Sequence, residues 1–163
     1  MAGNRVLFVD DDPILSLEVC LFLREFGFGV AQAASAADAY EAIDRRAPLT
    51  ALVTDINLGP GPDGFEVARR ARLVYPDLRV IYISGTAMDR YAAEGLKGAQ
   101  FIAKPLHPRQ IVEALRRESF REASSLSPVA ELAPDFGGLA AASARRTSPP
   151  QRFDGLKSVS LDK

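Results

Sequence analysis

Short apolar runs and amphipathic helical patterns alternate along residues 5–119 of the chain. Each apolar run ends at polar or turn-forming residues, which is typical of strands buried in a parallel sheet. The residues between the runs place their apolar positions at helical spacing. Strands are predicted at 5–9, 28–33, 51–55, 79–83 and 100–103, and helices at 13–26, 36–46, 63–75, 88–96 and 108–119. This alternation predicts a doubly wound α/β fold, in which helices cover both faces of a five-stranded parallel sheet.

Residues at the helix ends support these boundaries. Asp12 is suited to cap the first helix and Pro13 to occupy its first position, whereas Gly27 is suited to end it. Ser35 is a candidate N-cap for the second helix, and Pro76 stops the third. The first helix carries two sets of apolar residues at helical spacing: Ile14, Leu17 and Leu21, and Val19, Phe22 and Phe26.

The composition changes after Arg121, where serine, proline, glycine and alanine become frequent. A segment of this kind has little apolar surface to bury and is predicted to be disordered. We therefore expect a folded domain at 1–120 and a flexible tail at 121–163. The apolar residues scattered along the tail leave open a short docking element within 126–142.

Composition and charge exclude several classes of protein. The chain has 163 residues, 47% of them hydrophobic, which is enough for one domain with a core. Its 20 basic and 21 acidic side chains give a net charge of −1. The chain therefore lacks the excess of basic residues that would indicate nucleic acid binding. The single cysteine, Cys20, excludes an internal disulfide and is expected to be a small buried hydrophobe. With no membrane-spanning run and no signal-peptide pattern, the expected location is the cytoplasm.

Polar side chains follow four of the predicted strands. Asp10 and Asp11 come after the first strand, and Asp55 ends the third. Ser84 follows the fourth strand and Lys104 the fifth. Parallel strands bring these ends to one edge of the sheet, which is where open α/β sheets bind ligands. Each residue alone has an ordinary structural explanation, but four strands that end in complementary groups indicate a site.

The chemistry of this set points to phosphoryl transfer. Three neighbouring carboxylates repel one another, so the site needs a hard divalent cation, and Mg²⁺ prefers oxygen ligands. Asp55 would then be the nucleophile that forms an acyl phosphate. The ammonium group of Lys104 would offset charge on the transferred group, and Ser84 would donate a hydrogen bond to the phosphate oxygens.

Four short motifs carry a specific resemblance. Over about residues 4–119 the chain resembles the receiver domain of two-component response regulators, similar to single-domain receivers and to those attached to hybrid kinases. The flavodoxin-like fold of that family is the one expected here. The motifs are Val9-Asp10-Asp11, Thr54-Asp55-Ile56-Asn57, Ile83-Ser84-Gly85 and Phe101-Ile102-Ala103-Lys104-Pro105.

The resemblance implies a role for each matched residue. A histidine kinase or a histidine phosphotransfer protein would phosphorylate Asp55. Asp10 and Asp11 would form the acidic pair, with Asp11, Asp55 and the backbone carbonyl of Asn57 contacting the Mg²⁺. Lys104 would be the conserved lysine, and it would precede a cis peptide bond.

Other features of the family concern the output surface. By the same resemblance, Ser84 and Phe101 would be the switch pair, although Phe101 lacks the hydroxyl of the tyrosine often found there. The loop at 59–63 is one residue longer than in chemotaxis-type members. The short spacing between Ser84 and Phe101 predicts an abbreviated fourth helix.

The function expected from these features is a phosphorylation-operated switch or phosphorelay carrier that acts through protein contacts. It would be a monomer or a weak, phosphorylation-dependent dimer, and its only chemistry would be its own phosphorylation and dephosphorylation. A phosphate sink and a degenerate receiver with constitutive binding stay open as alternatives. A phosphatase of the haloacid-dehalogenase type would need an aspartate at Asn57, and a DNA-binding regulator would need a basic helix-turn-helix that the tail does not offer.

Overall fold

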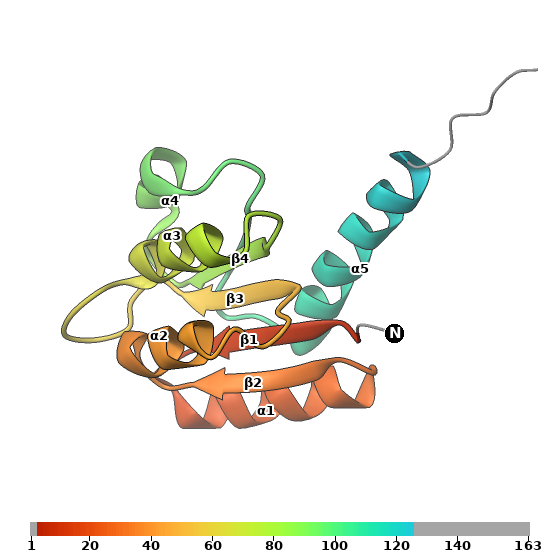
Figure 1. Cartoon of the computed structure of the whole chain (residues 1–163). Coiled ribbons are helices and arrows are strands. Elements are labelled where there is room, and N and C mark those ends of the chain that lie inside the picture. Colours follow the sequence, from red (N-terminus) through yellow and green to blue (C-terminus); the bar gives the residue numbers. More distant parts are fainter. Residues whose placement is uncertain (1–2, 126–163) are drawn as a thin grey trace, which may run out of the picture. The chain divides into compact units, whose positions relative to one another are not determined.

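The predicted strands pair into one parallel sheet in the order β2-β1-β3-β4-β5. This is a computed structural model, and it describes residues 3–125. The strands are β1 (Arg5–Val9), β2 (Gly29–Ala33), β3 (Ala51–Asp55), β4 (Arg79–Ser84) and β5 (Gln100–Ala103). All pairs are parallel, so the carboxyl ends of the strands share one edge, toward which the arrowheads point in Figure 1.

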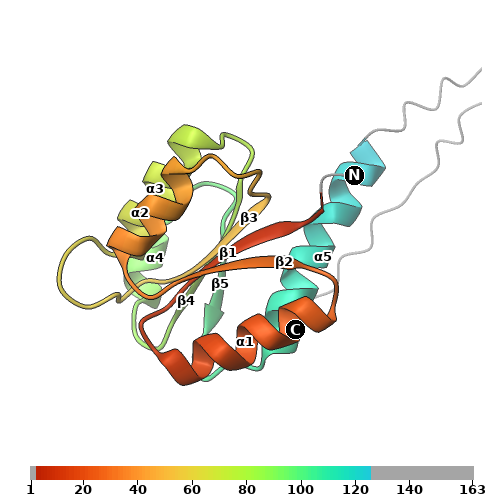
Figure 2. The ribbon, with the colours of Figure 1, turned by 60° about the horizontal axis from the view of Figure 1, so that its bottom comes forward.

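Helices cover both faces of this sheet, as the alternating pattern predicts. The helices α1 (Pro13–Glu25) and α5 (Pro108–Ser125) lie on one face, and α2 (Ala36–Asp44), α3 (Gly64–Val74) and α4 (Met88–Glu94) lie on the other (Figure 2). The doubly wound α/β fold is therefore confirmed. No helix among residues 3–125 has the length and apolar content that a membrane span needs.

Two apolar clusters hold the layers together. Successive strand side chains point to opposite faces, so each strand supplies both clusters. Leu7 and Leu52 pack with Phe65 on the side of α2 and α3, whereas Phe8 and Val53 pack on the side of α1 and α5. Burial of both strand faces explains why the strands read as continuous apolar runs. Cys20, 1% exposed, belongs to the second cluster, as expected.

The predicted helix caps are present. Asp12 caps α1, because its carboxylate accepts from the N–H groups of Ile14 (2.9 Å) and Leu15 (3.2 Å). The Ser35 hydroxyl accepts from the N–H of Asp38 at 3.1 Å and caps α2. Each bond satisfies a backbone donor that the first turn of a helix leaves free.

The last helix is longer than expected. It ends at Ser125, six residues beyond the predicted end at 119, because neither glycine nor proline interrupts the chain before Pro128. The first residues assigned to the tail, 121–125, are therefore helical. The predicted disorder of the tail and its docking element at 126–142 lie outside the described residues. In contrast, α2 ends at Asp44, two residues before the predicted end.

One of the two apolar sets on α1 faces solvent. Val19, Cys20 and Leu23 are buried against the sheet. Ile14, Leu17 and Leu21 are 79%, 59% and 51% exposed. Monomeric proteins rarely expose such a contiguous apolar row without a use for it. We call these three residues the α1 row.

Candidate functional site

The end of β1 supplies a buried and an exposed carboxylate. Asp10 is 1% exposed, whereas Asp11 lies on the surface. The Asp10 Oδ1 accepts from the N–H of Asp12 at 2.9 Å, and the Asp10 carbonyl accepts from the Ser16 hydroxyl at 3.3 Å. The turn into α1 therefore fixes the Asp10 side chain at the sheet edge.

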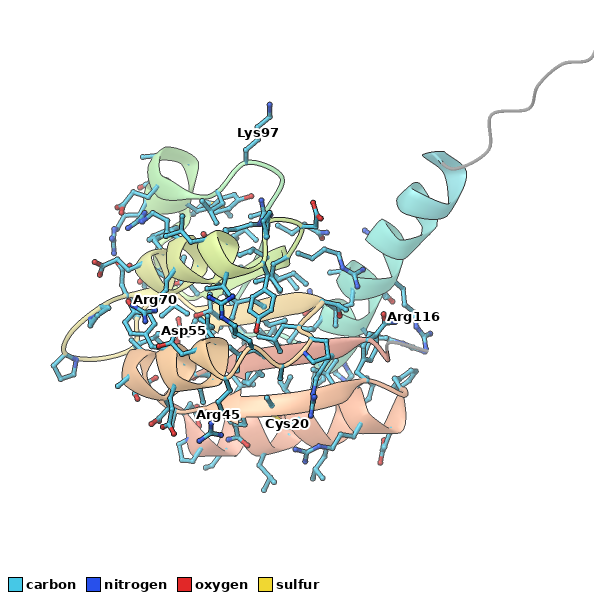
Figure 3. The ribbon with its side chains drawn as sticks, in the orientation of Figure 1. Cys20, Arg45, Asp55, Arg70, Lys97 and Arg116 are labelled. Atoms are coloured by element: carbon cyan, nitrogen blue, oxygen red, sulfur yellow. The ribbon has the colours of Figure 1, made fainter. Side chains whose placement is uncertain are left out.

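The end of β3 holds Asp55 in a comparable way. Its side chain is 8% exposed, and its Oδ1 accepts from the N–H of Asn57 at 3.1 Å. The N–H of Ile56, the residue after Asp55, donates to the carbonyl of Ile83 at 3.0 Å. This bond extends the pairing of β3 with β4 past the end of β3. These bonds leave the second carboxylate oxygen of Asp55, Oδ2, directed toward the site. Figure 3 shows Asp55 among the side chains at this edge.

Lys104 joins the two buried carboxylates. It follows β5, and its Nζ donates to Asp10 Oδ2 at 2.8 Å and to Asp55 Oδ2 at 2.7 Å. The Lys104–Pro105 peptide bond is cis, as the resemblance implies. Three residues that lie far apart in the sequence thus meet at a single ammonium group.

The charges in the site do not balance. Burial raises the pKa of Asp10 above its usual range, although hydrogen bonds from Lys104 and the Asp12 N–H oppose the shift. Burial lowers the pKa of Lys104, but its two carboxylate partners outweigh this effect and leave that pKa raised. The site thus contains one ammonium group, which contacts Asp10 and Asp55, and three carboxylates, of Asp10, Asp11 and Asp55.

The acidic set fits a hard divalent cation. Asp10, Asp11 and Asp55 each offer a carboxylate oxygen, and these oxygens lie within 4.8 Å of one another. Oxygen donors at this spacing, with excess negative charge, suit Mg²⁺. A cation here would relieve the repulsion that Lys104 balances only in part.

The remaining predicted residues lie around this centre. Ser84 is 1% exposed at the end of β4, and its Oγ accepts from the N–H of Thr86 at 3.3 Å. The Lys104 N–H donates to the Ser84 carbonyl at 2.9 Å, which ties the two strand ends together. Phe101 is half-buried beside Tyr91 of α4, with ring centroids 5.1 Å apart. The switch role of Ser84 and Phe101 stays a prediction.

Gly64 is a site residue that the motifs do not reveal. A Cβ at this position would lie 2.1 Å from the Asp55 carbonyl oxygen and 2.9 Å from the Ile56 Cα. The N–H of Gly64 donates to the Ile56 carbonyl at 2.9 Å. The first turn of α3 therefore presses directly on the backbone of Asp55. The available signal was a glycine in the first turn of a predicted helix.

Known proteins resemble this chain in sequence. The sequence model of the response regulator receiver domain matches residues 6–116. The response regulator receiver protein CpdR of Brucella abortus is 31% identical over 116 residues, which span 70% of this chain and 95% of CpdR. The transcriptional regulatory protein AruR of Pseudomonas aeruginosa is 32% identical over 143 residues, which span 82% of this chain and 57% of AruR.

A solved structure agrees with these relatives. The response regulator receiver protein from Sinorhizobium medicae WSM419 is 34% identical and superposes with a TM-score of 0.68, over 71% of this chain and 93% of that one. Its fold matches the sheet order and helical layers described above. The chain is a member of the response regulator receiver domain family.

Proposed function

We propose that this chain is a phosphorylation-operated switch that accepts a phosphoryl group on Asp55 from a histidine kinase or a histidine phosphotransfer protein. Receiver domains are phosphoacceptor switches of two-component systems and generally not enzymes. The observation that carries the proposal is the Lys104 ammonium group, which lies 2.7 Å from Asp55 Oδ2 and 2.8 Å from Asp10 Oδ2. Such an arrangement provides a nucleophilic oxygen beside a fixed positive charge.

Each residue of the site has a role in the proposed transfer. An Asp55 carboxylate oxygen forms the new bond to phosphorus as the bond from phosphorus to the donor histidine breaks. Lys104 stabilises charge on the transferred phosphoryl oxygens, and the Ser84 hydroxyl donates to one of them. Mg²⁺, when held by Asp11, Asp55 and the Asn57 carbonyl with Asp10 beside them, supplies further positive charge to those oxygens.

The product would change the site enough to signal. A phosphoryl group adds about −1.5 to −2 charges, and this biases a loop or helix between two arrangements. We propose that Ser84 and Phe101 carry the change to a protein effector in the cytoplasm. The chain would act as a monomer or as a weak dimer that forms on phosphorylation.

Intact-mass measurement tests the phosphoacceptor. Wild type incubated with acetyl phosphate and Mg²⁺ is expected to gain one phosphoryl group, and to gain none when the Mg²⁺ is chelated. Asp55→Asn is expected to gain none because the amide is not a nucleophile. Asp44→Asn, which changes an exposed aspartate of α2, serves as the matched control and is expected to behave as wild type. An adduct that persists in Asp55→Asn would exclude the assignment.

The α1 row is a candidate docking surface for the phosphodonor protein. The helix α1 begins directly after the acidic residues at the end of β1, so its exposed apolar residues lie on the approach to the site. A donor histidine must come within bonding distance of Asp55, which requires contact of this kind near that edge. An apolar helix of the donor could cover Ile14, Leu17 and Leu21 together.

Substitution within the α1 row tests this docking. The donor for this test is a histidine phosphotransfer domain that phosphorylates wild type. Leu17→Glu is expected to slow phosphoryl transfer from this donor by about tenfold or more, while the rate of phosphorylation by acetyl phosphate stays unchanged. Leu73→Glu is the matched control, because Leu73 is 85% exposed on α3. Equal rates for Leu17→Glu and Leu73→Glu with the protein donor would argue against docking through α1.

A further inference from the structure

The short helix α4 has few contacts of its own to hold it. None of its seven residues is buried, and no side chain caps its N-terminus at Ala87. The Tyr91 hydroxyl donates to the Ala99 carbonyl at 2.7 Å, and the Tyr91 ring lies beside Phe101. A helix with so little burial belongs to the least stable part of a fold. Contacts outside α4 must therefore contribute to its position.

Arg90 connects α4 to the start of α3. Its Nη2 donates to Asp63 Oδ2 at 2.7 Å, and its guanidinium lies over the ring of Phe65, 5.1 Å from the centroid. The Arg90 Nε donates to Glu94 Oε1 at 2.9 Å, which orients the guanidinium from within α4. The ion pair is partly shielded, because the Arg90 and Asp63 side chains are 46% and 25% exposed.

The two oxygens of the Asp63 carboxylate have separate partners. Oδ1 accepts from the N–H groups of Phe65 (3.0 Å) and Glu66 (3.1 Å) and thereby caps α3. Oδ2 accepts from Arg90. The same side chain thus holds the first turn of α3 and binds α4.

The first turn of α3 lies against the phosphoacceptor strand. Gly64, between Asp63 and Phe65, packs so closely on the Asp55 carbonyl that no Cβ fits there. A displacement of the Asp55 backbone therefore moves Gly64, and with it the residues on either side that bind Arg90. A continuous set of contacts runs from Asp55 through Gly64 and Asp63 to Arg90.

We propose that Asp63 and Arg90 form a latch that keeps α4 in the position seen here, and that its release is coupled to phosphorylation of Asp55. The coupling rests on the proposed function, whereas the latch itself does not. When the ion pair between Asp63 and Arg90 breaks, α4 can move relative to β5. The surface formed by α4 and β5 then takes a second arrangement. Because coupling is reciprocal, variants that open the latch also favour the phosphorylated state.

Amide hydrogen exchange of residues 88–94 in the unphosphorylated full chain tests the latch. Arg90→Gln and Asp63→Asn are each expected to speed this exchange about two- to fivefold, the range for a partly exposed ion pair. Asn retains a cap oxygen for α3 but replaces the charged oxygen that faces Arg90. The effect of Asp63→Asn therefore reports the latch rather than loss of the cap.

The chain offers a closely matched control. Arg70 of α3 pairs with Asp44 of α2 at 2.8 Å and lies over the Tyr40 ring, 4.7 Å from its centroid, away from α4. Arg70→Gln and Asp44→Asn are expected to leave exchange of residues 88–94 unchanged. The latch is overturned if these controls speed that exchange as much as the latch variants, or if Arg90→Gln does not speed it.

The phosphorylated state and an equilibrium mimic of it test the coupling. Binding of Mg²⁺ and beryllofluoride, a mimic of the phosphoryl group on aspartate, is expected to be about two- to fivefold tighter in Arg90→Gln than in wild type, and wild type phosphorylated by acetyl phosphate is expected to exchange residues 88–94 faster than the unphosphorylated form. Equal beryllofluoride affinities of wild type and Arg90→Gln overturn the coupling. If wild type takes up no phosphoryl group, the proposed function and the coupling both fail, and the exchange comparison still decides the latch.

Discussion

Replacement of Gly64 by alanine is expected to lower the free energy of unfolding by about 2–3 kcal/mol, the upper part of the range for a group forced into a well-packed region. The added Cβ would meet the Asp55 carbonyl oxygen at 2.1 Å and the Ile56 Cα at 2.9 Å, and both are backbone atoms. No side-chain rotation can relieve the contact, so α3 or β3 must move. Urea unfolding, followed by circular dichroism, measures the loss.

The same substitution is expected to impair the site, because the displaced backbone is that of Asp55. Phosphorylation by acetyl phosphate should fall together with stability in Gly64→Ala. Gly29→Ala is the control: the nearest atom to its Cβ would be the Arg5 Cγ at 3.6 Å, an ordinary contact. If Gly64→Ala unfolds at the same urea concentration as Gly29→Ala, the close approach of α3 to Asp55 is not as described.

Hydrophobic periodicity was sufficient to predict the fold, but it was weaker at helix ends. The five strands follow from short apolar runs that end in polar residues, and Asp12 and Ser35 cap the helices as predicted. The predicted end of α5 was wrong by six residues, because no glycine or proline interrupts the segment between the predicted end at 119 and Ser125. The exposure of the α1 row was also not predicted. The helix α1 is apolar on two sides, and periodicity alone does not say which side packs against the sheet.

The sequence predicted those residues of the candidate site that lie at the ends of strands. Asp10, Asp55 and Lys104 lie at the ends of strands that the pattern identifies, and the structure brings them within hydrogen-bonding distance. Gly64 and Arg90 were missed because their roles depend on contacts across the fold. The pair of Arg90 and Asp63, 27 residues apart, leaves no periodic signal in the sequence.

Replacement of Lys104 by methionine is expected to lower the free energy of unfolding by about 2–3 kcal/mol in the absence of Mg²⁺, somewhat below the range for breaking a fully buried ion pair. The side chains of Asp10 and Asp55 are 0% and 8% exposed, so both carboxylates would lose a hydrogen-bonded cation in a dry setting. The 23% exposure of Lys104 admits some solvent and reduces the loss. Lys97→Met is the control, because Lys97 projects into solvent (Figure 3).

The pH and Mg²⁺ dependence of this loss distinguishes electrostatics from packing. Burial already raises the pKa of Asp10, and an acid whose pKa is raised in the folded state destabilises that state increasingly as pH rises from its ordinary pKa to the raised pKa, and by a constant amount above it. The difference in free energy of unfolding between wild type and Lys104→Met should therefore become smaller on acidification. In wild type the Lys104 contribution should persist up to about pH 10 and disappear as pH rises through its raised pKa.

Two further measurements complete this test. Mg²⁺ should restore stability to Lys104→Met, because a cation among the three carboxylates replaces the missing positive charge. Asp10→Asn combined with Lys104→Met should recover part of the loss, since one buried charge is removed. If the loss of stability is instead independent of pH, Mg²⁺ and the Asp10 substitution, then it arises from the packing of the methionine side chain, and the ammonium group of Lys104 does not balance the charge of the acidic site.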